Sequence, residues 1–132
     1  MAYTIGLDYG TNSCRCVIVN VANGEEVGSA IYEYETGEHG IILDKRDHNV
    51  ARQNPADYVN GIEVTIKKAM AAAKKADKKF KAESVIGIGV DTTGSTPLPV
   101  DRDGTPLAML KEFKKNPNAM AWLWKDHTSY AE

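Results

Sequence analysis

The stretch Thr4-Ile-Gly-Leu-Asp-Tyr-Gly-Thr-Asn-Ser-Cys-Arg15 decides the fold that we expect for this chain. An apolar run over residues 3–8 ends in Asp8, a short polar turn follows, and a second apolar run covers residues 14–21. Two apolar runs separated by a short turn that contains glycine are typical of a β-hairpin. The sequence therefore predicts two antiparallel strands joined by a tight polar turn.

The turn of this hairpin carries groups that suit a phosphate. Gly10 lets the backbone approach a ligand closely, and successive backbone N–H groups in such a turn can form an anion-binding concavity. Arg15 adds a positively charged fork, and three consecutive residues add side-chain donors: Thr11, Asn12 and Ser13. Asp8 repels phosphate unless a divalent cation such as Mg²⁺ lies between them. The alternative is a surface hairpin with ordinary turn residues.

Composition and charge exclude several classes of protein. With 132 residues, of which 42% are hydrophobic and 26% charged, the chain can form one domain with a real core. Its net charge of −2 gives no electrostatic case for a nucleic-acid partner. No apolar run is long enough to span a membrane, and the first residues do not resemble a signal peptide. We therefore expect a cytoplasmic protein, with Cys14 and Cys16 as free buried thiols.

The middle of the chain adds a strand, a loop and a helix. Residues 26–34 alternate as a third antiparallel strand, and residues 35–53 form a long polar loop that can include one short strand. Asn54 is a typical N-cap, and the proline and aspartate that follow it favour a helix start. The sequence thus predicts three strands followed by a helix.

A second apolar run, residues 84–91, follows the helix and ends in Asp91. Because it has no polar alternation, we expect a strand that is buried on both faces and pairs in parallel with the first strand. Asp8 and Asp91 would then emerge at the same edge of the sheet, where ligands bind in such folds. Aspartate is also common wherever a strand becomes a loop, so this pairing has a purely structural alternative.

The last third of the chain is polar and irregular. Residues 92–96 form a second polar cluster, residues 98–108 resemble a β-hairpin, and residues 118–128 indicate either a short helix or an extended segment. Trp122 and Trp124 are expected in the core, although a tryptophan near polar groups can also line a sugar site.

These elements give an α/β fold: three antiparallel strands, then a helix and a parallel strand in a mixed sheet. This order and the motif Gly6-Leu-Asp-Tyr-Gly-Thr-Asn-Ser-Cys-Arg15 resemble the ribonuclease H-like core of the sugar kinase, Hsp70 and actin superfamily. Three later motifs narrow the resemblance to the FGGY carbohydrate kinases, and among them to the ribulokinase branch. They are Val90-Asp-Thr-Thr-Gly-Ser-Thr-Pro-Leu-Pro-Val-Asp101, Gly104-x-Pro-Leu-Ala108 and Asn116-Pro-Asn-Ala-Met-Ala-Trp-Leu-Trp-Lys-Asp-His-Thr128. The resemblance covers residues 1–132 as an N-terminal kinase domain.

The resemblance implies roles for individual residues. Asp8 would hold Mg²⁺, and the β- and γ-phosphates of ATP would contact the hairpin turn through Gly10, Thr11, Asn12, Ser13 and Arg15. A ketose such as L-ribulose would lie against two segments, formed by Gly94, Ser95 and Thr96 and by Trp124, Lys125, Asp126 and His127. The resemblance assigns no role to Asp91.

The resemblance also implies a second domain that supplies the catalytic base, and nothing in these residues matches it. We therefore expect an N-terminal fragment that has no kinase activity alone and exposes faces through which a homodimer can form. Two alternatives remain open, a non-catalytic actin-like nucleotide-binding module and a scaffold that binds nothing. The hairpin motif fits both the kinase and the actin-like module, whereas the two sugar-side motifs favour the kinase.

Overall fold

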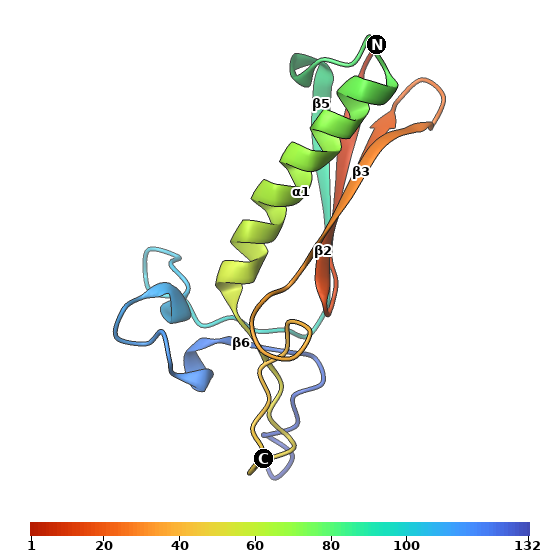
Figure 1. Cartoon of the computed structure of the whole chain (residues 1–132). Helices are drawn as coiled ribbons and strands as arrows, with labels where there is room; N and C mark the ends of the chain where they lie inside the picture. Colours follow the sequence, from red (N-terminus) through yellow and green to blue (C-terminus); the bar gives the residue numbers. More distant parts are fainter.

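The computed structural model describes residues 1–132 and confirms the predicted α/β order. Its main sheet contains the strands β1 (Tyr3–Tyr9), β2 (Ser13–Asn20), β3 (Glu26–Glu33) and β5 (Val85–Thr92). The strand order is β3-β2-β1-β5. β1 pairs antiparallel with β2 and parallel with β5, and β2 pairs antiparallel with β3. Figure 1 shows helix α1 (Pro55–Ala76) lying along one face of this sheet.

Helix α1 begins where the sequence predicts. The side chain of Asn54 accepts a hydrogen bond of 3.0 Å from the backbone N–H of Ala56, and Pro55 occupies the first turn. Two lysines, Lys74 and Lys75, lie in the last turn, where the helix dipole favours positive charge. No helix of the structure combines the length and the apolar character that crossing a membrane requires.

The main core lies between α1 and the sheet. Alternate residues of β1 and β2 point toward the helix and are buried: Tyr3, Ile5, Leu7, Cys16 and Ile18. Small residues let the two layers approach closely. A Cβ added at Gly28 of β3 would lie 2.4 Å from the carbonyl oxygen of Ala69, and one at Gly61 would lie 2.7 Å from the Cβ of Cys14. Cys14 and Cys16 are free and buried, as expected.

The prediction that the 84–91 strand is buried on both faces is wrong. β5 has the expected parallel pairing with β1, but Ile86, Ile88 and Val90 are 68%, 58% and 60% exposed. The reason is its position, because β5 forms an edge of the sheet and α1 packs against β2 and β3 instead. An uninterrupted apolar run shows that a strand tolerates burial, and the neighbouring elements decide whether burial occurs.

The loops gather below the carboxyl ends of β1 and β5 (Figure 1). There, β4 (Arg52–Gln53) pairs antiparallel with β6 (Ala121–Trp122) in a second, two-stranded sheet. The expected hairpin at 98–108 is reduced to a single bridge between Val100 and Pro106. The 118–128 segment is neither the expected short α-helix nor a continuous extended strand: it begins within a 3₁₀ helix, η3 (Pro117–Ala119), contains the two residues of β6, and is otherwise turns and irregular backbone. Two further 3₁₀ turns are η1 (Ala82–Ser84) and η2 (Leu107–Met109).

Candidate functional site

The loops that follow β1 and β5 leave the sheet at the same edge. Asp8 and Asp91 are register partners in the parallel pair, and the backbone N–H of Thr93 donates to the carbonyl of Tyr9 at 3.1 Å. The expected position of Asp8 and Asp91 at the same edge of the sheet is therefore confirmed. It follows from the crossover through α1, which returns the chain in parallel beside β1.

The hairpin turn is closed by a hydrogen bond of 2.9 Å from the N–H of Gly10 to the carbonyl of Ser13. Next to it, Asp8 and Arg15 face each other across β1 and β2 and form an ion pair of 3.3 Å. Their side chains are 44% and 57% exposed, so the pair stays open to solvent. An exposed carboxylate beside an exposed guanidinium can exchange this contact for a cation and a phosphate.

Two of the remaining turn residues, Thr11 and Asn12, form hydrogen bonds with other segments of the chain. The side chain of Gln53 donates to the carbonyl of Thr11 at 2.7 Å, and the amide of Asn12 donates to the carbonyl of His39 at 2.7 Å. Ser13 is buried at the start of β2. The turn is thus attached to β4 and to the 35–53 loop, and of the expected phosphate ligands Asn12 and Arg15 are exposed.

The loop after β5 surrounds a small cavity. Ser95 has a φ of 53°, a left-handed conformation that is uncommon outside glycine and often found at functional sites. The hydroxyls of Thr93 and Thr96 are 3.3 Å apart. The cavity measures about 250 Å³ and is lined by Tyr9, Tyr58, Thr92, Thr93, Thr96 and Leu98.

Sequence reasoning missed the two tyrosines of this cavity. Tyr9 follows Asp8 on β1 and therefore points to the opposite face, the face that α1 covers. Tyr58 lies in the first turn of α1, and its ring packs edge-to-face on that of Tyr9 at 5.9 Å between centroids. The alternation of side chains between the two faces of β1 is the sequence signal that could have placed Tyr9 on the helix side. Tyr58 reaches the cavity only because of how α1 packs on the sheet.

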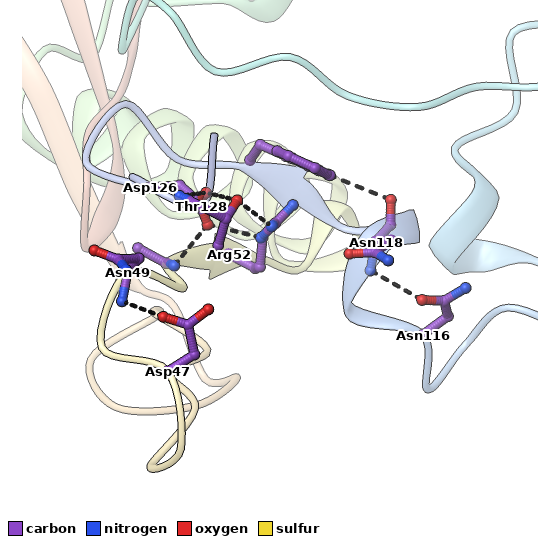
Figure 2. A network of polar contacts seen from close by, with 9 residues as sticks. Asp47, Asn49, Arg52, Asn116, Asn118, Asp126 and Thr128 are labelled. Atoms are coloured by element: carbon purple, nitrogen blue, oxygen red, sulfur yellow. Dashed lines mark hydrogen bonds and ion pairs between the residues drawn. The ribbon is translucent and has the colours of Figure 1, made fainter. Parts of the chain in front are cut away.

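Asp126 points into the protein interior instead of an open cavity. Its carboxylate contacts Nε of Arg52 at 2.8 Å, and the two side chains are only 4% and 3% exposed. It also accepts hydrogen bonds from the N–H of Ala51 and from Thr128, as Figure 2 shows. The guanidinium of Arg52 stacks on the ring of Trp122, 3.4 Å from its centroid. Asp126 therefore fastens the C-terminal segment to β4.

Burial alone would raise the pKa of the Asp126 carboxyl. The hydrogen bonds from Ala51 and Thr128 and the charge of Arg52 outweigh this effect, so its pKa is lower than that of an ordinary aspartate. Burial has the opposite effect on Arg52 and lowers the pKa of its guanidinium, which the charge of Asp126 counteracts in part. Both groups therefore stay charged as a pair at neutral pH.

Trp124 brings the second sugar-side motif to the hairpin turn. It was expected in the core but is 55% exposed, and its indole Nε1–H donates to the hydroxyl of Thr11 at 3.2 Å. Lys125 is half-buried beside it, and His127 is exposed with its backbone N–H bonded to the carbonyl of Asn49. Residues more than 100 positions apart in the chain thus meet at Thr11.

Comparison with known proteins agrees with this arrangement. Residues 3–127 match the N-terminal domain of the FGGY family of carbohydrate kinases. The chain belongs to this family. A ribulokinase from Vibrio parahaemolyticus is 45% identical to this FGGY chain over 130 residues, and one from Halalkalibacterium halodurans is 39% identical over 134 residues. These alignments cover 98% and 96% of the chain but 22% of each relative, so the chain spans about a fifth of their length.

A solved structure supports the same fold. A xylulose kinase from Brucella ovis superposes with a TM-score of 0.72 at 22% sequence identity, covering 98% of this FGGY chain and 22% of the kinase. At this level of identity the likeness concerns the fold alone. The expected relation to the actin-like kinase fold is thereby confirmed.

The residues of the FGGY site fit a magnesium ion that is bound together with phosphates. No cluster of three or more histidine, cysteine, aspartate or glutamate side chains could hold a metal by itself. Mg²⁺ usually keeps several waters and binds one or two carboxylates plus substrate phosphates. Asp8, exposed at the end of β1 with Asp91 beside it, matches that requirement.

Proposed function

We propose that this chain is the N-terminal domain of a cytoplasmic ribulokinase, which transfers the γ-phosphate of ATP to the 5-hydroxyl of L-ribulose in L-arabinose breakdown. The observation that supports it best is the contact between Trp124 and Thr11, which joins the sugar-side motif to the phosphate-side turn. The names of the two bacterial relatives point to the same substrate class.

In this proposal the open side of the hairpin turn receives ATP. Asp8 would hold Mg²⁺, which would supply positive charge next to the phosphates. Arg15 would release Asp8 and bind the β- and γ-phosphates, together with donors from the turn: Gly10, Thr11, Asn12 and Ser13. Gly10, whose N–H is bonded to the carbonyl of Ser13, and the buried Ser13 can donate only if the turn rearranges. Asn12 takes part only if its amide leaves the carbonyl of His39.

The ketose lies between the loop after β5 and the C-terminal segment. Gly94, Ser95 and Thr96 line it on one side, and Trp124, Lys125 and His127 line it on the other. Asp126 contributes indirectly, because its pairing with Arg52 holds this segment in place. Ser95 holds a left-handed conformation in the middle of this loop.

A second domain beyond these residues is proposed to supply the base that deprotonates the sugar hydroxyl. Phosphoryl transfer depends mainly on positioning and charge stabilisation, and one wall of a cleft provides little of either. We therefore expect the 132-residue chain to bind substrates weakly and to release no ADP in a coupled assay with L-ribulose.

The nucleotide site is tested by titrating the chain with Mg²⁺ and a non-hydrolysable ATP analogue, followed by NMR. Arg15→Ala should weaken binding about tenfold or more, because hydrogen bonds to charged groups contribute about 1.5–3 kcal/mol. Arg46→Ala is the matched control, since Arg46 is equally an exposed arginine paired with an aspartate at 3.3 Å. Equal effects of the two substitutions would contradict the proposed site.

A parallel titration with L-ribulose separates the kinase from an actin-like module. Shifts at Thr96 and Trp124 are expected for the kinase. Nucleotide binding without any response to a pentulose would instead support a non-catalytic nucleotide-binding module.

A further inference from the structure

Thr11 is held by two different parts of the chain. Its carbonyl accepts a hydrogen bond of 2.7 Å from Nε2 of Gln53, and its hydroxyl accepts one of 3.2 Å from Nε1 of Trp124. Gln53 belongs to β4 and is 1% exposed, whereas Trp124 follows β6 and is 55% exposed. The backbone of Thr11 is therefore held by a buried group and its side chain by an exposed one.

The side-chain amide of Gln53 is fixed in orientation. The hydroxyl of Tyr58 donates to Oε1 of Gln53 at 2.6 Å, so the amide nitrogen of Gln53 must face the carbonyl of Thr11. Tyr58 is itself packed against the rings of Tyr9 and Tyr34. These contacts fix the backbone of Thr11, so that its hydroxyl is the group whose hydrogen bonding can change.

The direction of the Trp124 bond decides where the proton of Thr11 points. An indole N–H can only donate, so the hydroxyl oxygen of Thr11 is the acceptor and its own proton is free to donate elsewhere. A hydroxyl that accepts a hydrogen bond also becomes a stronger donor. The bond from Trp124 therefore prepares Thr11 to donate to an anionic oxygen in the turn.

We propose that the Trp124–Thr11 hydrogen bond couples the two substrate sites, so that a ketose against the indole of Trp124 strengthens the binding of nucleotide phosphate by Thr11. This inference rests on the proposed function. The half-exposed indole exchanges its bond with water in the free protein, and a sugar that covers the ring shields that bond and orders it. By linkage, the nucleotide must strengthen ketose binding by the same factor.

The bond itself is tested without any ligand. The chain has two tryptophans, so a ¹⁵N spectrum contains two indole N–H signals, and Trp122 serves as the internal control because its indole donates to the carbonyl of Asn118. Thr11→Val should move the signal of Trp124 and leave that of Trp122 in place. Thr11→Ser, which keeps the hydroxyl, should restore the original position. No response of Trp124 to Thr11→Val would overturn the inference.

Coupling is tested by measuring the Kd of a non-hydrolysable ATP analogue with Mg²⁺, in the absence and presence of saturating L-ribulose. We expect the ketose to lower this Kd about two- to tenfold, the range given by one net hydrogen bond. The factor should vanish in Thr11→Val and in Trp124→Phe, and persist in Thr11→Ser and in the control Trp122→Phe.

The outcomes separate this inference from the proposed function. Binding of both ligands with independent affinities, or coupling that survives Thr11→Val and Trp124→Phe, overturns the inference and leaves the proposed function standing. Failure of either ligand to bind at concentrations up to its solubility contradicts both. Coupling that depends on the hydroxyl of residue 11 and on the indole N–H of residue 124 supports the inference.

Discussion

The carboxylate of Asp126 lies in the interior against the guanidinium of Arg52, although the family resemblance implies a place for it in a sugar site. Removing one partner of a buried ion pair leaves the other charge uncompensated, which typically costs about 3–5 kcal/mol. We expect Asp126→Asn to lower the free energy of unfolding by about this amount in urea titrations. Asp44→Asn, in the exposed pair with Arg46, is the control and should change the free energy of unfolding far less, because water and salt screen an exposed pair.

The same residue predicts an acid dependence of stability. Because the pKa of Asp126 is lower in the folded protein than in the unfolded chain, its contribution is present above the unfolded pKa of about 3.9 and is lost as the pH falls through the lowered folded pKa. Urea titrations between pH 6 and pH 3 should show a smaller loss of stability in Asp126→Asn than in the wild type. Parallel losses in the two proteins would contradict this assignment.

The close contact between α1 and the sheet depends on a glycine, Gly28, which has no side chain to keep the two layers apart. A Cβ at Gly28 would lie 2.4 Å from a backbone oxygen of the helix, so the two layers must separate to accept it. We expect Gly28→Ala to destabilise the protein by about 1–3 kcal/mol, the usual cost of overpacking a core. Gly89→Ala on β5 is the matched control, because nothing lies within 4 Å of its added Cβ. Thermal unfolding of the two variants should differ clearly, and similar midpoints would argue against this close packing.

At the scale of elements, the sequence correctly predicts those features that depend only on neighbouring residues. Asn54 and Pro55 mark the start of α1 because capping involves only neighbouring residues. The alternation of β1 and β2 follows from the pleat of a strand. The burial of β5 was mispredicted because it depends on which elements cover the strand, and the helix that precedes β5 packs on β2 and β3.

At the scale of the whole molecule, the main sheet has two edge strands, β3 and β5, and β5 carries a row of exposed apolar side chains. Such an edge favours pairing with another strand. We expect the isolated chain to self-associate with rising concentration in sedimentation velocity, and Ile88→Lys to shift it toward the monomer. Ile31→Lys on β3, which is equally 58% exposed, should have little effect. A larger effect of Ile31→Lys would move the interface to the other edge.

The candidate site shows the same division between sequence and structure. Asp8, the polar turn and Arg15 could be identified from the sequence because they are contiguous and their residue types suit phosphate and magnesium. Tyr58 and Gln53 could not, because each reaches the site through contacts between elements that are distant in the chain. The family resemblance implies that Trp124 is a sugar-side residue, but its bond to Thr11 appears only in three dimensions.

The sequence by itself determined the order of strands and helix, the hairpin with its polar turn, and the family to which the chain belongs. These features depend on spacing, capping and residue type, which act over a few neighbouring residues. Only the tertiary structure decided that β5 is exposed, that Asp126 is buried with Arg52, and that Trp124 contacts Thr11. Those outcomes depend on which surfaces meet when distant segments pack, because burial and pairing are properties of the assembled layers.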